Sequence, residues 1–394
     1  MPGFLPAEAT ARPARAARAD GIDVLKGVAC TLIVWHHLAA YGPMSDVVHL
    51  TFPRVTGWLY DNARLAVQVF LVVGGFLSAA ALPRHQARIA QQCRPIFQQL
   101  LQPVLQRFSR LAPAYWVALA VSMAVSAGVR PWFDHPSVPD APTWPQVAAH
   151  VLLLHDVLGQ PALSAGIWYV AIDLQLYALA ALVTLAGGWA KRSGASTTTA
   201  RRVAMAATWV LAALSLLVFN RQPGLDTTAL YFFGAYGLGM LAFWATQLTA
   251  SRERLLWVGL LTLTALLALW LDFRSRIALA LGVAWVLVWW QWSAAVASTS
   301  TSRSSAMHVS AFGRVVWAPL SWLGKRSYSI FLIHFPVCLL FNAVLAQAFP
   351  TQLGANVLGM LTAFAMSVLA GAWLHRHVEV RVRRQPVVRQ IATG

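Results

Sequence analysis

Ten apolar runs, each long enough to cross a lipid bilayer, constrain this chain more than any other feature. They fall at about 22–41, 65–82, 111–129, 168–188, 203–219, 228–248, 254–271, 277–292, 327–347 and 353–374. A hydrocarbon core of ~30 Å is crossed by about 20 apolar helical residues. Within lipid, a helix pairs all of its backbone polar groups internally. We therefore expect an all-α polytopic membrane protein with about ten transmembrane helices.

Composition and charge support the same class. Of the 394 residues, 58% are hydrophobic and 11% are charged, which is far from the average of a soluble domain. Most of the 30 lysines and arginines, 24 of them, lie in alternate connecting segments: 1–26, 83–110, 189–202, 249–254, 293–326 and 375–394. The positive-inside rule then places both termini in the cytoplasm. We expect a basic N-terminal tail (1–21), a membrane domain (22–374) and a basic C-terminal tail (375–394).

The net charge of +17 requires no nucleic acid partner, because the basic segments suit the anionic lipid of an inner membrane surface. The C-terminal tail supplies several of these cations, including Arg381, Arg383, Arg384 and Arg389. Residues 1–20, rich in Ala and Arg, are also typical of a transit peptide. The apolar segment after them is too long for a signal sequence, so we expect them to remain as a cytoplasmic tail.

The first apolar run carries two ionisable side chains, Lys26 and His37. Eleven helical residues make about three turns, so both side chains share one face and lie about 16 Å apart. Ionisable groups inside a membrane span are costly unless they face a protein interior or a wet cavity. We therefore interpret this pair as functional.

The segment RFSRLAPAY (107–115) places Arg107 and Arg110 one turn apart at the start of the third apolar run. Two guanidinium groups at this spacing can bind phosphate oxygens together, as in a coenzyme A thioester. Ordinary anchoring at the inner membrane surface is the alternative interpretation.

The segment GIWYVAIDLQLYAL (166–179) contains a carboxylate, Asp173, inside a span, with Trp168, Gln175 and Tyr177 nearby. Counting from an outer end at Trp168, Asp173 lies about 7 Å deep, close to the depth expected for His37. We therefore predict that Asp173 contacts and orients His37, which then acts as a base. Separate partners for the two groups remain the alternative.

The segment LGKRSYSIFLIHFPV (323–337) places His334 about 12 Å along a helix from Arg326. This depth is close to the middle of a membrane. A single histidine on an apolar helix is more often a packing group with its hydrogen bonds satisfied, so His334 by itself is a weaker candidate.

Two other patterns are interpreted structurally. Gly74 and Gly75, inside the second apolar run, suit close contact between helices. Cys30, Cys93 and Cys338 lack paired or metal-binding spacing, so we predict neither a disulfide framework nor a metal site.

Four motifs in order carry a resemblance to a known family. They read D-x-x-K-G with a histidine ten intervening residues after the lysine, R-x-x-R-L-x-P-x-Y, W-Y-x-x-x-D-x-Q-x-Y and S-Y-S-I-F-L-I-H. In this order, on a chain with ten expected spans, they resemble the acyltransferase-3 family of integral membrane acyltransferases.

The resemblance implies transfer of an acyl group, commonly acetyl, from cytoplasmic acyl-CoA to a hydroxyl of a bacterial envelope polysaccharide or other glycoside. It implies residence in the bacterial inner membrane. Carried over by motif, the catalytic candidates are His37, Asp173 and His334, and the donor-binding candidates are Lys26, Arg107 and Arg110. Trp168, Gln175 and Tyr177 are the candidates for acceptor binding. Asp173 stands where the family more often has Glu, and Phe331 replaces the usual Tyr.

The expected mechanism places the CoA phosphates near Lys26 and the arginines, with the thioester reaching toward His37. His37 serves either as the general base or as a transient acyl carrier. The chain completes the transfer itself or hands the acyl group to a partner. The alternative class is a proton-coupled transporter or flippase, in which the same intramembrane groups relay protons.

Overall fold

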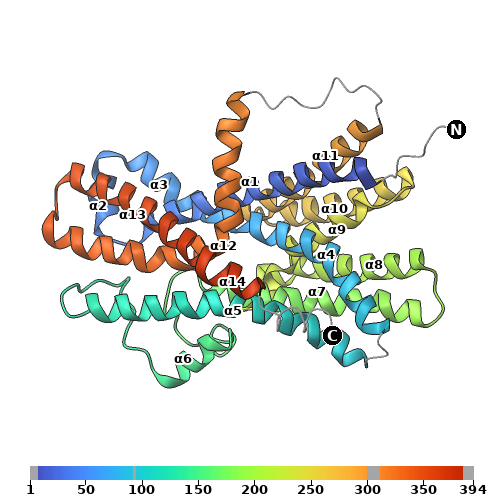
Figure 1. The fold of residues 1–394 in the computed structure, drawn as a ribbon, viewed down its shortest axis with the longest axis horizontal. Helices are drawn as coiled ribbons and strands as arrows, with labels where there is room; N and C mark the ends of the chain where they lie inside the picture. Colours follow the sequence, from blue (N-terminus) through green and yellow to red (C-terminus); the bar gives the residue numbers. More distant parts are fainter. Residues whose placement is uncertain (1–7, 92–94, 300–310, 385–394) are drawn as a thin grey trace.

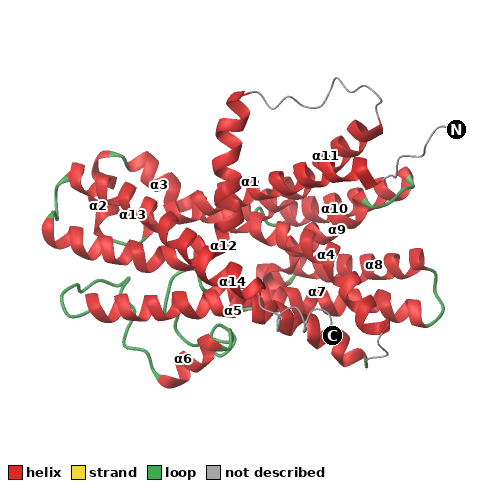
Figure 2. Cartoon of the chain, in the orientation of Figure 1, coloured by secondary structure: helices red, strands yellow, loops and turns green. Residues whose placement is uncertain are grey.

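The computed structural model describes the backbone of residues 8–91, 95–299 and 311–384, and no strand occurs in these ranges. The α-helices are α1 (Glu8–Ala40), α2 (Pro43–Thr51), α3 (Pro53–Asn62), α4 (Val67–Gln91), α5 (Ile96–Val129), α6 (Trp144–Val151), α7 (Trp168–Arg192), α8 (Thr197–Leu217), α9 (Ala229–Thr246), α10 (Ser251–Leu271), α11 (Ser275–Thr299), α12 (Ala311–Ala348), α13 (Leu353–Leu374) and α14 (Val380–Arg384). Three 3₁₀ turns, η1 (Ala63–Ala66), η2 (Phe219–Arg221) and η3 (Pro223–Leu225), and a π-helical turn, η5 (His375–Glu379), complete the described elements. Figure 2 shows helices joined by loops throughout.

The predicted fold class is confirmed. Among the described residues, nine helices are long and apolar enough to cross a membrane. The expected span at 277–292 also forms a helix, α11, which is not one of these nine and whose side chains are described only to Ser293. The expected C-terminal tail starts within helical structure, because η5 and α14 continue the chain from α13 to Arg384.

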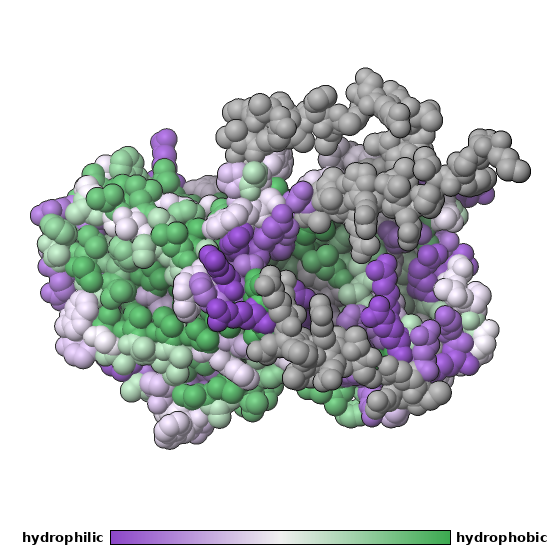
Figure 3. All heavy atoms as spheres, in the orientation of Figure 1, coloured by the Kyte–Doolittle hydropathy of each residue, from purple (hydrophilic) through white to green (hydrophobic). Residues whose placement is uncertain are grey.

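Two groups of helices meet near the middle of the molecule. Figure 1 shows α2, α3, α12 and α13 on the left of the view and α4 with α7 to α11 on the right. The long helix α5 contacts both α12 on one side and α7 on the other. Leu358, Leu361 and Leu369 of α13 are exposed, and Figure 3 shows apolar side chains over much of the face formed by α5, α12 and α13. Such a surface suits contact with lipid.

Glycine residues allow the closest helix contacts. A Cβ at Gly27 of α1 would overlap the Leu320 carbonyl of α12, and one at Gly324 of α12 would overlap the Asp23 carbonyl of α1. Small residues let helix backbones approach closely in membranes, where dispersion forces drive association. Beyond this close contact the two helices run in parallel, since Cys30 Sγ contacts the Ser327 carbonyl and Asn342 Nδ2 donates to the Tyr41 carbonyl farther along both helices.

The α4 and α9 helices pack in the same way, which confirms the packing role predicted for Gly75. A Cβ there would overlap the Tyr236 carbonyl, and one at Gly239 would overlap the Val72 carbonyl. The neighbouring Gly74 instead lies against the Tyr236 ring and lines the cavity described below.

We expect Gly75→Leu to lower the apparent unfolding temperature of the protein in detergent, because its side chain forces α4 away from α9. Overpacking of a tight contact costs about 1–3 kcal/mol. Gly259→Ala in α10 is the matched control, since a Cβ there meets no atom within 4 Å. Thermal unfolding of both variants checks the prediction, and an unchanged Gly75→Leu midpoint would contradict it.

Candidate active site

A cavity of about 180 Å³ lies where α1, α4, α5, α7, α12 and η5 meet. Its lining carries most of the ionisable residues that the motifs indicate. The charged residues around it are Lys26, Arg107, Arg110, Asp173, Lys325 and Glu379. The tertiary structure thus brings together Lys26, both arginines and Asp173 from three separate motifs.

Arg107 and Asp173 form an ion pair in the wall of this cavity. Arg107 Nη2 donates to Asp173 Oδ2 at 2.7 Å and to Oδ1 at 2.9 Å, and Nε donates to Oδ2 at 3.1 Å. The guanidinium also lies over the Tyr177 ring, 5.1 Å from its centroid. The side chains are only 24% and 8% exposed, so the pair is largely shielded from solvent.

The predicted contact between Asp173 and His37 is therefore wrong. Asp173 lies at the level of Lys26, which lines the same cavity, whereas His37 lies about 16 Å farther along α1. The error came from taking Trp168 as the outer surface. In the structure α7 begins inside the protein, since the preceding Leu163, Ser164 and Ile167 are buried.

His37 instead lies beside His334, as the parallel contact of α1 and α12 requires. The two ring centroids are 4.8 Å apart, and His37 also stacks on Tyr41 at 5.1 Å. His37 is 7% exposed and His334 is completely buried. The two histidines of separate motifs thus form one buried pair.

The hydrogen bonds of His334 determine which of its nitrogens can act as a base. Nδ1 lies 2.7 Å from the Phe331 carbonyl. A carbonyl only accepts, so Nδ1 carries the proton and Nε2 keeps its lone pair. Nε2 of His334 and Nδ1 of His37 are both buried, with no hydrogen-bond partner among the described residues. An imidazole held in this tautomer can accept a proton from a substrate hydroxyl.

Two aromatic rings separate the cavity from the histidine pair. Phe331 and Tyr169 line the cavity, with ring centroids 5.5 Å apart, and Phe331 lies 5.9 Å from His334. Gly166 borders the pair, since a Cβ there would come within 3.7 Å of His334 Cε1, and its φ of +84° favours glycine. The site therefore consists of a charged cavity and a buried histidine pair, with the rings of Phe331 and Tyr169 between them.

Comparison with known proteins shows the family of the chain. A family model described as an acyltransferase domain, that of the acyltransferase-3 family, matches residues 19–376, nearly the whole chain. The chain belongs to the acyltransferase-3 family. The family match identifies it as an acyltransferase, and its apolar helices indicate a multi-pass membrane protein.

One curated relative is the "Regulator of hypoxia-inducible factor 1" of Caenorhabditis elegans, 25% identical over 177 residues. The match covers 42% of this chain and 34% of that protein, so the chain spans about a third of the relative's length. No solved structure matches the chain.

The remaining motif residues of this acyltransferase-3 protein have other contacts. Trp168 packs on Phe232, with centroids 5.6 Å apart, and Gln175 Oε1 accepts from the backbone N–H of Ala229 at the start of α9. Neither lines the cavity. The structure thus gives Trp168 and Gln175 packing and capping contacts, while Tyr177 lies against Arg107.

Among the ionisable residues of the lining, Lys325, Tyr328 and Glu379 were not singled out from the sequence. Glu379 is 4% exposed although it falls in the expected basic tail. It is the single acidic residue in 375–394, among five arginines. That isolated carboxylate was the sequence signal that could have indicated it.

A cluster of polar residues outside the spans is separate from the active site. His150 of α6 and His155 are fully buried and stacked, with centroids 4.1 Å apart. Burial lowers the pKa of His155 to about 3 and also lowers that of His150. Burial, with repulsion from Asp226, raises the pKa of Asp156 to about 6. Although His155 Nε2 and Asp156 Oδ2 are 3.6 Å apart, no pH makes both groups charged.

These shifts predict opposite pH dependences of stability. Folding keeps His155 neutral, so the free energy of unfolding falls as pH drops below 6.5, where this residue takes up a proton in the unfolded chain. Folding keeps Asp156 protonated up to about pH 6, so the stability that Asp156 contributes is lost as pH rises from about 4 to 6. A difference of one bound proton between the unfolded and folded states changes the free energy of unfolding by about 1.4 kcal/mol per pH unit. We expect Asp156→Asn to make the protein more acid-labile between pH 6 and 4, and His155→Gln to make it less so. Apparent unfolding temperatures across this range check both, and equal slopes in the two variants would refute the assignment.

In the described part of the chain, no group of three or more His, Cys, Asp or Glu residues is placed to hold a metal ion. Cys30 and Cys338 are buried free thiols, and Cys93 lies outside the described residues.

Proposed function

We propose that this protein transfers an acyl group, in the first instance acetyl, from cytoplasmic acyl-CoA to a hydroxyl of an envelope polysaccharide or other glycoside. The observation that carries this proposal is the cavity with four cations in its lining, next to a buried pair of histidines with an available ring nitrogen. A donor with several phosphates needs such cations. An acceptor hydroxyl needs such a base.

The donor is proposed to bind with its phosphates near Lys26, Arg110 and Lys325. Lys26 Nζ donates to Asp23 at 2.8 Å and Lys325 Nζ to Asp20 at 3.2 Å, so both ammonium groups are already held at the cavity by carboxylates of α1. The pantetheine arm then extends past Phe331 toward the histidine pair, about 16 Å along α1. Arg107, occupied by Asp173, supports the cavity wall.

The proposed chemistry uses the lone pair of His334 Nε2. The acceptor hydroxyl gives its proton to Nε2 while its oxygen attacks the thioester carbonyl. The new C–O bond forms, the C–S bond breaks, and the imidazolium returns the proton to the departing thiolate. His37 either assists as the neighbouring base or carries the acyl group briefly as an acyl-imidazole.

The proposed setting is the bacterial inner membrane, with both termini in the cytoplasm and the basic connecting segments against anionic lipid. This orientation places the donor cavity, which is lined by residues in the first half of α5, on the side where acyl-CoA is available. The acceptor then reaches the histidine pair from the opposite side.

The deciding experiment is acyl-CoA turnover by the purified protein in nanodiscs, with and without envelope glycan. Native protein is compared with Arg110→Ala, and with Arg88→Ala as a control that removes a cation outside the cavity lining. Glycan-dependent release of free CoA, with a raised apparent KM for acetyl-CoA in Arg110→Ala alone, supports the proposal. Absence of acetyl-CoA binding to the native protein would favour the transporter or flippase instead.

A further inference from the structure

We infer that Glu379 is a positioning residue that holds α12 in the orientation that the donor cavity and the histidine pair require. The inference rests on the proposed function, because it assigns Glu379 a role in binding the acyl-CoA donor. It starts from an unusual backbone feature. Glu379 ends η5, a π-helical turn, and such turns occur frequently at functional sites.

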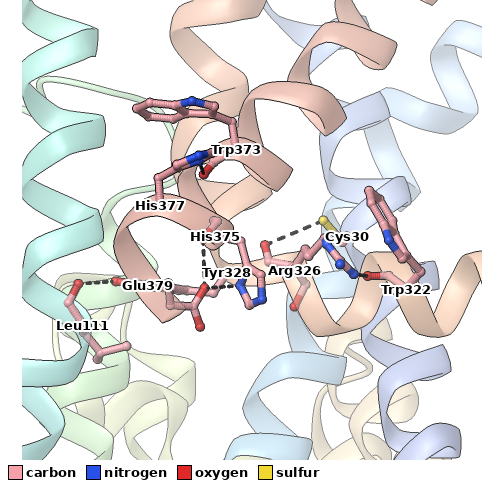
Figure 4. Close-up of polar contacts among 11 residues, drawn as sticks. Cys30, Leu111, Trp322, Arg326, Tyr328, Trp373, His375, His377 and Glu379 are labelled. Carbon is pink, nitrogen blue, oxygen red and sulfur yellow. Dashed lines mark hydrogen bonds and ion pairs between the residues drawn. The ribbon is translucent and has the colours of Figure 1, made fainter. Parts of the chain in front are cut away.

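The Glu379 carboxylate joins two elements. Its Oε2 accepts hydrogen bonds from Ser329 Oγ of α12 and from His375 Nδ1, both at 2.8 Å. Ser329 is fully buried and Glu379 is 4% exposed, so these bonds are shielded from water. Figure 4 shows the Glu379 carboxylate directed at the His375 ring, beside Tyr328. Charge-assisted hydrogen bonds of this kind are stronger than neutral ones.

Three consecutive residues of α12 are tied to three different elements. The Ser327 carbonyl is 3.8 Å from Cys30 Sγ of α1, and Tyr328 Oη donates to the Leu111 carbonyl of α5 at 2.9 Å. Ser329 bonds to Glu379 after α13. Figure 4 shows these contacts together. We call residues 327–329 the α12 clamp.

The clamp controls which side of α12 faces the donor. Ser327, Tyr328 and Phe331 line the cavity, and His334 follows one turn after Phe331 on the same helix. Rotation of α12 would therefore move the cavity wall and the base together. Of these three contacts, the one between Ser329 and Glu379 joins two side chains, and Glu379 itself lines the cavity. Loss of the hydrogen bond between Ser329 and Glu379 should weaken donor binding more than it slows the chemical step.

Replacement of Glu379 by glutamine distinguishes a positioning role of this residue from a role of its carboxylate charge. A glutamine at 379 keeps an oxygen that can accept from both Ser329 and His375, while it removes the charge. An alanine removes both bonds. Ser329→Ala removes one bond from the α12 side and leaves the carboxylate bonded to His375. His377→Ala is the control, because His377 lies in the same turn and is partly exposed, and its described contacts are a hydrogen bond to the Trp373 carbonyl and stacking on the Trp373 ring.

The test is steady-state turnover of acetyl-CoA by the full chain in nanodiscs, with unfolding temperature and acetyl-CoA binding measured alongside. We expect Glu379→Ala to raise the KM for acetyl-CoA at least tenfold and to lower kcat by a smaller factor, because the base moves with the cavity wall. We expect Ser329→Ala to raise KM about threefold. Glu379→Gln and His377→Ala should stay within threefold of the native protein in both parameters.

Equal damage from Glu379→Gln and Glu379→Ala would overturn the positioning role, as would an unchanged KM in a folded Glu379→Ala protein. If Glu379→Ala does not fold, an unchanged KM in Ser329→Ala overturns it. Native protein that does not bind acetyl-CoA would overturn the proposed function and this inference with it. Native binding with equal binding by Glu379→Ala would overturn this inference alone.

Discussion

Acyl transfer is expected to fall about 10²- to 10⁴-fold when His334 or His37 is replaced by alanine, the range typical of a lost general base. The reason is the pairing of the two rings, 4.8 Å apart, with Nε2 of His334 left available by the bond from Nδ1 to Phe331. The double variant should lose no more than either single variant, because residues that act as a unit are not additive. Release of CoA in the presence of glycan is the measurement.

His36 provides the matched control for this prediction. It is the same residue type on the same helix, but its Nδ1 bonds to the Leu59 carbonyl and its ring is only partly buried. His36→Ala should leave turnover within a few fold of native. Comparable losses in His36→Ala and His37→Ala, or full activity in His334→Ala, would contradict the assignment of the base.

The second large effect concerns the Arg107 and Asp173 pair. Asp173→Ala is expected to destabilise the protein by about 3–5 kcal/mol, because removal of one partner leaves a buried charge unpaired. Partial exposure of Arg107, at 24%, favours the lower end of this range. Arg107→Met combined with Asp173→Leu should recover most of the loss, since no charge then remains buried. Unfolding temperature in detergent measures each variant.

An exposed ion pair in the same protein gives the comparison. Arg202 Nε lies 2.7 Å from Glu253 Oε1, but the Arg202 side chain is 56% exposed. Exposed pairs contribute little to stability, so Glu253→Gln should leave the unfolding temperature nearly unchanged. A double variant at 107 and 173 as unstable as Asp173→Ala would show that the loss does not arise from an unpaired charge.

The residue types of the site were predictable, but their partners were not. Lys26, Arg107, Arg110 and Asp173 do converge on one cavity. Their depths were counted from the assumed ends of apolar runs, however, and those ends do not coincide with a common surface. α7 begins inside the protein, and α5 extends from Ile96, well before its apolar run. Asp173 consequently meets Arg107 rather than His37.

The burial of Glu379 is a second feature that the sequence did not predict. Local composition places it in a basic tail, because it is surrounded by arginines and follows the last apolar run. Its burial depends on Ser329 and His375, and Ser329 is 50 residues away in the sequence. No periodicity along the chain encodes such a contact.

The sequence by itself determined that this protein is an all-helical membrane protein and, through four ordered motifs, that it belongs to the acyltransferase-3 family. These are local properties, because apolar length and internal hydrogen bonding suffice to specify a spanning helix. Only the tertiary structure decided that His37 pairs with His334 and Asp173 with Arg107. These pairings depend on how far each helix extends and on which neighbouring helix its glycine residues contact, as Gly27 and Gly324 do for α1 and α12.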